Sequence, residues 1–156
     1  MRTGVVKSLP AKIGVQSVEI STIAHATDDL AKVQTALCFL LPEPMKERTV
    51  FTRRYLQGHH GNAIVTFDAK LNRLADVEQF STHFLRQLPR NERLLIKRDL
   101  EMYTDAEGNL YIRLGKQQAY RGILELSEED PIRVKMKFSR LSGEAKGLMQ
   151  RLLELE

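Results

Sequence analysis

Hydrophobic and polar residues alternate along several short stretches of the chain, as they do in strands that bury one face of a sheet. The alternation is cleanest near the C-terminus, where Ile132, Val134, Met136 and Phe138 are separated by polar or charged residues. The other alternating stretches are rich in β-branched and aromatic residues, which favour strands. The pattern predicts strands over residues 15–26, 48–57, 63–71, 110–114, 122–126 and 132–139.

Between these stretches the apolar residues recur every three or four positions, as on one face of an amphipathic helix. One stripe runs through Leu30, Val33 and Leu37, and Thr27 in front of it is a suitable N-cap. Asn91 is placed to cap a later helix in the same way. The spacing predicts helices over residues 27–41, 72–88, 91–102 and 143–156, with a short helical turn over 116–120.

The mixture of strands, helices and tight turns predicts an α+β fold. The strands at 48–57 and 63–71 flank a glycine-bounded link at 58–62, which indicates a hairpin. We therefore expect a mostly antiparallel mixed sheet with helices packed on one face. Residues 15–156 are expected to form a single domain, and residues 1–14, which are basic and contain no acid, a flexible arm.

Composition narrows the class of protein only a little. The 156 residues suffice for one hydrophobic core, and 42% of them are apolar. The net charge of +4 permits a nucleic acid or an anionic membrane as a partner without requiring either. Cys38 is the single cysteine, so an internal disulfide is excluded. Neither a signal peptide nor an apolar run of membrane-spanning length is visible, so we expect a cytoplasmic protein with no membrane partner.

The strand predicted at 132–139 carries a basic face. Arg133, Lys135 and Lys137 lie two positions apart, so their side chains project to the same side about 7 Å from one another. No acid lies within this strand, and Arg140 continues the row beyond it. Because the face opposite the helices is free, such a row is placed to contact successive phosphates of a nucleic acid.

Further cations are candidates for the same surface. These candidates are Arg53, Lys70, Arg113 and Lys116. Tyr55 shares a strand face with Arg53, and Tyr111 shares one with Arg113, which suits stacking beside phosphate contacts on single-stranded RNA. Arg53 and Arg54 are adjacent and point to opposite faces, so only one of them can lie on the free surface of a regular strand.

Other interpretations of these residues remain open. Lys and Arg on the solvent side of a sheet also protect it against aggregation, without any ligand. His59 and His60 either contact RNA backbone or simply form a turn, in which the flanking glycines take positive φ. Adjacent histidines do not readily chelate one metal, and no Cys or His lies nearby at a suitable spacing. We expect no metal site, no cofactor and no catalytic residue.

Four short segments, in this order and spacing, resemble an archaeal RNA-binding family predicted to be an exosome-associated subunit. They are the Ala-Thr-Asp-Asp helix start within 20–41, Gly-His-His-Gly-Asn at 58–62, Gly-Asn-Leu-Tyr-Ile-Arg-Leu at 108–114 followed by Lys116-Gln117, and Asp-Pro-Ile-Arg-Val at 130–134. The resemblance extends over residues 18–139. It implies a ribosomal-protein-like α+β fold, similar to that of a large-subunit protein that binds ribosomal RNA. It also implies RNA binding, an archaeal cytoplasmic location and no intrinsic catalysis.

The expected function is therefore that of a non-catalytic RNA-binding protein. Its expected partners are RNA and an RNA-processing (exosome) or ribosome-related assembly. The alternative is a protein-interaction or dimerisation module without direct RNA contact, in which a homodimer would form through exposed apolar surface.

Overall fold

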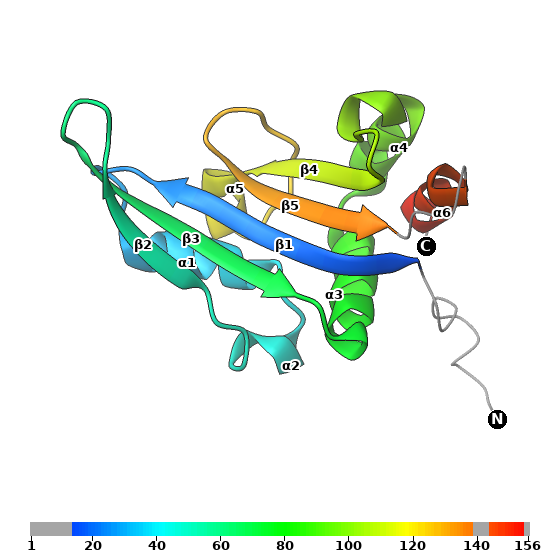
Figure 1. Cartoon of the computed structure of the whole chain (residues 1–156), viewed down its shortest axis with the longest axis horizontal. Helices are drawn as coiled ribbons and strands as arrows, with labels where there is room; N and C mark the ends of the chain where they lie inside the picture. The colour runs from blue at the N-terminus through cyan, green and yellow to red at the C-terminus, as the bar shows by residue number, and fades with distance from the viewer. Residues whose placement is uncertain (1–13, 139–143, 155–156) are drawn as a thin grey trace.

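A computed structural model describes residues 14–138 and 144–154 of the chain. Five strands form one antiparallel sheet in the order β2-β3-β1-β5-β4 (Figure 1). The strands are β1 (Val15–Ala24), β2 (Thr52–Gln57), β3 (Ala63–Leu71), β4 (Asn109–Gly115) and β5 (Pro131–Phe138). The predicted α+β class and antiparallel sheet are confirmed.

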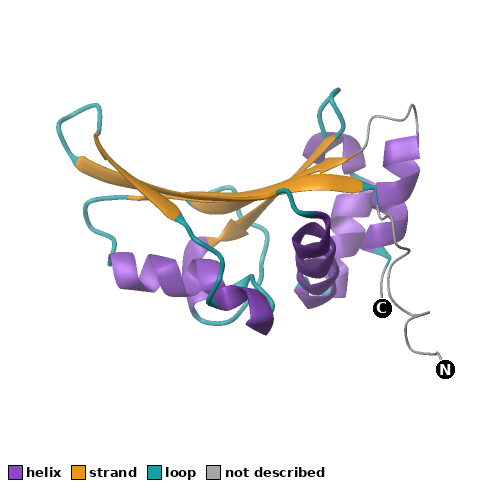
Figure 2. Cartoon of the chain, turned by 60° about the horizontal axis from the view of Figure 1, so that its bottom comes forward, coloured by secondary structure: helices purple, strands orange, loops and turns teal. Residues whose placement is uncertain are grey.

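The helices cover one face of this sheet and leave the other bare (Figure 2). They are α1 (Leu30–Phe39), α2 (Glu43–Lys46), α3 (Leu74–Gln87), α4 (Arg90–Arg98), α5 (Lys116–Tyr120) and α6 (Glu144–Leu153), with a 3₁₀ turn at Leu100–Tyr103. The sheet curves, so the bare face, here called the open face, is concave (Figure 2). This arrangement follows from the alternation in the sequence, since each central strand buries every second residue.

The core lies between the sheet and the helices. Phe67 of β3 and Phe138 of β5 are fully buried against helical side chains that include Phe80 and Phe84. The rings of Phe80 and Phe84 are stacked with their centroids 5.3 Å apart. Phe80 and Phe84 are four residues apart on α3, the spacing that places two side chains on one helical face.

Two predicted helix caps are wrong. The N-cap of α1 is Asp29 rather than Thr27, and its carboxylate accepts hydrogen bonds from the backbone N–H groups of Ala31 and Lys32. Asp28 is thereby left outside the helix and free to bind elsewhere. Pro89 rather than Asn91 is the N-cap of α4, and it provides no side-chain hydrogen bond to the helix.

The strand predicted at 122–126 is also wrong. This segment forms only one isolated bridge, between Leu114 and Leu126, at the outer edge of β4. Two backbone hydrogen bonds flank it: the N–H of Gly115 donates to Glu125 (2.9 Å) and the N–H of Ser127 donates to Arg113 (3.0 Å). Contact this short is insufficient for a sixth strand.

Among the described residues, no helix is both long and apolar enough to cross a membrane. Residues 1–13 lie outside the described part of the chain, so the flexible basic arm stays a prediction. The same holds for the single-domain boundary at residue 15.

Candidate nucleic-acid interface

The predicted basic row lies on the open face. Val134 and Met136 of β5 are buried toward the helices, so Arg133, Lys135 and Lys137 project to the opposite side. This β5 row runs along a strand that pairs on both sides, with β1 and with β4. Its cations therefore occupy the body of the sheet and not an edge.

Cross-strand register surrounds the β5 row with specific neighbours. Lys135 is paired with Glu19 of β1 on one side and with Tyr111 of β4 on the other. Arg133 is paired with Arg113 of β4. Directly opposed residues on one face of an antiparallel pair have Cβ atoms about 5 Å apart, so these side chains lie within contact range.

Tyr111 lies beside two of these cations. The Nζ atom of Lys135 and the Cζ atom of Arg113 are each 5.8 Å from the centroid of its ring. Its hydroxyl donates a hydrogen bond to Oδ2 of Asp105 (2.9 Å), and this bond raises the pKa of Tyr111. Tyr111 is the one aromatic residue on the described open face, and its ring is shared with two cations. The predicted pairing of Tyr111 with Arg113 is confirmed.

Asp105 organises the turn before β4. Burial by itself opposes ionisation of this carboxyl, but hydrogen bonds from Asn109, Tyr111 and the N–H of Glu107 outweigh it and lower its pKa to about 2. The carboxylate is therefore charged at neutral pH and holds the Tyr111 hydroxyl in place.

The rest of the open face adds three cations and two acids. In β3, Lys70 is paired with Glu19, and Asp68 lies one step further along the same face. Arg54 of β2 is paired with Thr66 of β3. At the open-face positions of the strands the cations are Arg54, Lys70, Arg113, Arg133, Lys135 and Lys137, and the acids are Glu19 and Asp68. Acids of the neighbouring loops border them: Glu128 lies 3.9 Å from Arg113, Asp105 binds Tyr111, and Asp130 lines a cavity beside Arg133. The strand positions of this face therefore carry more cations than acids, and the cations come from four of the five strands.

Arg53 does not belong to this surface, contrary to the prediction. It is paired with Phe67, which is buried toward the helices, so Arg53 and Tyr55 lie on the helix side of the edge strand β2. The Cζ atom of Arg53 is 4.8 Å from the centroid of the Phe67 ring, and its Nη2 atom lies 3.4 Å from Oε1 of Gln34 in α1. Arg54 takes the open-face position instead.

Lys116 is not a surface cation either. Its side chain is only 3% exposed, and its Nζ atom donates to three acceptors: the carbonyl of Ile23 (2.6 Å), Oδ2 of Asp28 (3.1 Å) and Oδ1 of Asp130 (3.0 Å). Asp130 also lies 3.1 Å from Nε2 of His25. Three protons on one ammonium group meet three acceptors, so Lys116 is a structural cross-link.

Asp28 of this cluster is held in its ionised form. Burial by itself raises its pKa, but the backbone N–H of His25 and the ammonium of Lys116 reverse the effect and lower it. The cluster joins the end of β1, the loop before α1 and the start of β5. It thereby fixes one end of the sheet.

The remaining predicted residues lie at the margins. His59 and His60 are exposed in the turn between β2 and β3, with ring centroids 5.0 Å apart. Of the two flanking glycines, Gly61 takes the expected positive φ and Gly58 does not. Arg140 lies outside the described residues. Within the described part of the chain, no cluster of three His, Cys, Asp or Glu side chains could hold a metal ion.

Comparison with known proteins shows the family of this chain. Residues 17–138 match a family model described as RNA binding. The chain belongs to this RNA-binding family. The matched region includes all five strands apart from the first residues of β1. Every charged residue of the open face thus lies within the family region.

Curated relatives come from archaea. The chain is 33% identical over 131 residues to RNA-binding protein PAB1135 of Pyrococcus abyssi, covering 83% of this chain and 85% of that one. It is 27% identical over 120 residues to the uncharacterized protein MJ0213 of Methanocaldococcus jannaschii, covering 76% and 80%. The predicted relationship to archaeal RNA-binding proteins is confirmed.

Two solved archaeal proteins share the fold of this chain. Protein AF2318 from Archaeglobus fulgidus superposes with a TM-score of 0.75 at 26% identity and covers 91% of this chain and 99% of its own. Protein SSO0741 from Sulfolobus solfataricus gives 0.72 at 25% identity, with 88% and 96% covered. Both are described as DUF54 proteins. The predicted likeness to a ribosomal protein stays a prediction.

Three charged open-face residues, Glu19, Arg54 and Asp68, were not among the residues predicted from the sequence. The hairpin link at 58–62 pairs Gln57 with Ala63, and counting back from this pair sets Arg54 opposite Thr66. Thr66 and Asp68 are the polar members of the alternation in β3, so they mark the open face. Register counted from the turn would have selected Arg54 over Arg53.

Proposed function

We propose that this protein binds RNA on the open face of its sheet and does not catalyse a reaction. One observation carries the proposal: the strand positions of this face hold six cations, from four strands, and two acids. Phosphate contacts from Lys and Arg provide most of the affinity of such surfaces for nucleic acid. Membership of the RNA-binding family supports the choice of RNA.

The centre of the proposed interface is the β5 row. Arg133 and Lys137 lie about 13 Å apart along the strand, with Lys135 between them, so the row can follow a backbone over several nucleotides. Arg113 widens the row on the β4 side, and Lys70 extends it across β1. At the ends of the interface we propose additional RNA contacts by Arg140 and by the turn histidines His59 and His60. We assign no RNA contact to Arg53, because it lies on the helix side of the sheet, or to Lys116, because it is buried.

We further propose that the protein works within an RNA-processing (exosome) or ribosome-related assembly in the cytoplasm. The support is the resemblance of residues 18–139 to a family predicted to act there, together with the RNA-binding description of the family. Co-purification of tagged protein from archaeal cells, with and without ribonuclease, tests this part. If neither exosome nor ribosomal proteins are recovered, the proposed assembly is rejected, while the proposal of RNA binding is unaffected.

Filter binding of single-stranded and hairpin RNA across a salt series tests RNA binding itself. Contact with about four phosphates of a single strand should make log K fall with log salt at a slope of about −3. Absence of binding at low salt, or a slope near zero, would reject the proposal. Intact RNA after prolonged incubation is the expected result for a non-catalytic protein, and cleavage would contradict it.

A protein-interaction module is the second candidate, favoured by the edge strand β2. All six of its residues are exposed, including Tyr55 at 68% and Leu56 at 52%, and Val50 just before it is 76% exposed. An exposed edge with large apolar side chains can pair with another chain. Sedimentation equilibrium at micromolar concentration tests self-association, and a monomer would exclude the homodimer form of this candidate.

A further inference from the structure

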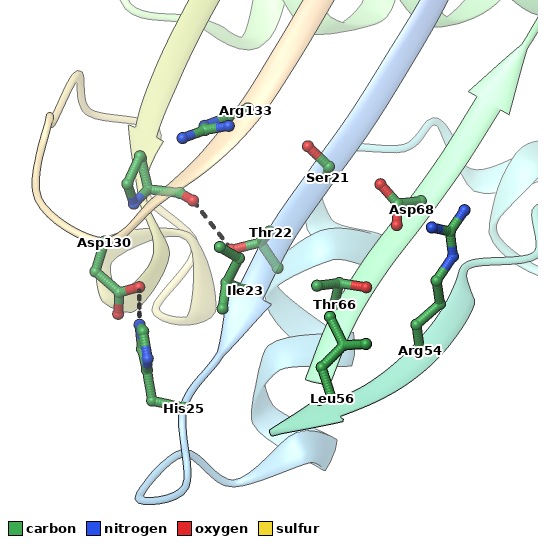
Figure 3. Close-up of a pocket in the computed structure, with 11 residues that line it drawn as sticks. Ser21, Thr22, Ile23, His25, Arg54, Leu56, Thr66, Asp68, Asp130 and Arg133 are labelled. Atoms are coloured by element: carbon green, nitrogen blue, oxygen red, sulfur yellow. Dashed lines mark hydrogen bonds and ion pairs between the residues drawn. The ribbon is translucent and has the colours of Figure 1, made fainter. Parts of the chain in front are cut away.

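A cavity of about 440 Å³ opens on the concave face, beside the β5 row (Figure 3). It lies where β1 ends and β5 begins, and it reaches across β3 to β2. Its volume falls within the range of about 300–1,000 Å³ that is typical of small-molecule sites. Arg133 lines the cavity and also begins the β5 row, so RNA bound along the row would pass the mouth of the cavity.

Charged groups without protein partners gather in this cavity. Arg54, Asp68 and Arg133 all line it, and within the described part of the chain none of the three makes a side-chain hydrogen bond or ion pair (Figure 3). The hydroxyls of Ser21 and Thr66 lie on the same wall (Figure 3). These groups offer both donors and an acceptor to a ligand, which a surface built for phosphate alone would not need.

Apolar side chains complete the cavity. Ile23 and Leu56 line it and remain 40% and 52% exposed, so both can pack against the flat face of a ligand. A base can thus be held without an aromatic partner, and Tyr111, which is flanked by its own two cations, is not required.

The rim near β5 is held by internal contacts. The hydroxyl of Thr22 donates to the carbonyl of Pro131 (3.0 Å), and His25 contacts Asp130 (3.1 Å). The ammonium group of Lys116 donates hydrogen bonds to Asp130 and to the carbonyl of Ile23. The cavity therefore exists before any ligand enters, which lowers the cost of binding.

We propose that this cavity is a binding subsite for one unpaired guanine of the RNA. Guanine is the base that presents two adjacent N–H donors, N1–H and N2–H, to a carboxylate, and Asp68 can accept both. On its other edge guanine presents O6 and N7, the acceptors that arginine binds with two hydrogen bonds, and Arg54 lines the cavity and can donate both. Adenine lacks O6, and uracil and cytosine lack the paired donors. Asp68 would repel a terminal phosphate, so a base fits better than an anion.

This inference rests on the proposed RNA binding. The test compares hairpin RNAs with a single guanine, inosine or adenine among the uridines of the loop, measured by fluorescence anisotropy at one low salt concentration. Inosine keeps N1–H and O6 but lacks the N2 amino group. We expect wild-type protein to bind the guanine loop about tenfold more tightly than the inosine loop, since a hydrogen bond to a charged group is lost.

Two isosteric variants complete the test. D68N should bring the guanine-to-inosine affinity ratio close to one, because the amide presents an N–H group to the N–H groups of guanine. E19Q makes the same charge change on the same face beside Lys135 and Lys70, and it should keep the ratio. Thermal melting of both variants checks that they fold.

The outcomes separate the two proposals. Equal affinity of wild-type protein for the three loops, with the expected salt slope, overturns the guanine subsite alone. A ratio that survives D68N, or one that E19Q abolishes as well, overturns the role of Asp68. Failure to bind any of the RNAs at low salt overturns RNA binding itself, and the subsite with it.

Discussion

Lys116 and Asp130 lie 14 positions apart in the sequence and meet in an ion pair of 3.0 Å at one end of the sheet. The same ammonium group binds Asp28 and the carbonyl of Ile23, so it ties α5 to β1, to the loop before α1 and to the start of β5. Asp130 takes φ +47, a conformation that costs energy in a residue other than glycine. Its contacts with Lys116 and His25 hold it there.

Removing this cation should destabilise the fold rather than reduce RNA contact. K116M keeps the length of the side chain but leaves two carboxylates near a buried position without their counter-charge. We expect a loss of about 3 kcal/mol in the free energy of unfolding, at the low end for a broken buried pair because Asp130 is 43% exposed. Urea unfolding measures this loss. The triple variant K116M/D28N/D130N should recover part of it, and a triple variant no more stable than K116M would contradict the electrostatic explanation.

The β5 row should control the salt dependence of RNA binding. Replacing Arg133, Lys135 and Lys137 with alanine should reduce the magnitude of the single-strand salt slope by about 2, since three phosphate contacts are lost. The matched control replaces three exposed arginines of the helix side, Arg90, Arg121 and Arg151, and should keep the slope. Equal losses in both triple variants would show that net charge alone is responsible and that the open face is not the interface.

Arg53 and Arg54 offer a comparison between adjacent residues with opposite orientation. R54A should weaken RNA binding without changing stability, because Arg54 lies on the open face and has no partner within the described part of the chain. R53A should leave RNA affinity unchanged and cost about 0.5–1 kcal/mol, because its guanidinium packs over Phe67. The RNA affinity and the melting temperature of the two variants measure these effects. Weaker RNA binding by R53A, with R54A unaffected, would reverse the assignment of the two faces.

Stability should decline in acid partly through Asp105. Its folded-state pKa of about 2 is below the ordinary value of 3.8, so the ionised form stabilises the folded protein. This contribution is fully present above about pH 4 and is lost as the pH falls through about 2. Carboxyl NMR titration of wild-type protein and Y111F measures the shift. Y111F, which removes one hydrogen bond, should raise the pKa of Asp105, and an unchanged value would show that Tyr111 does not contribute.

Local pattern was sufficient for most of the secondary structure and for the β5 row. Alternation in β5 and β3, and helical spacing in α3, predicted these elements to within about two residues of their observed ends. Arg133, Lys135 and Lys137 share a face because side chains alternate along any strand, whatever surrounds it. The wrong caps occur where neighbouring residues compete for one position, and the strand predicted at 122–126 fails because only Leu126 forms a bridge to the sheet.

What the sequence by itself determined is the α+β class, the open sheet face and the central row of cations on it. Only the tertiary structure decided which cations of the other strands lie on the same open face. Register sets Arg54 on the open face and turns Arg53 toward Phe67, and the ends of three elements converge to bury Lys116 between two carboxylates. Charge and periodicity cannot distinguish such lysines and arginines, because the surroundings of a side chain depend on residues that are distant in the sequence.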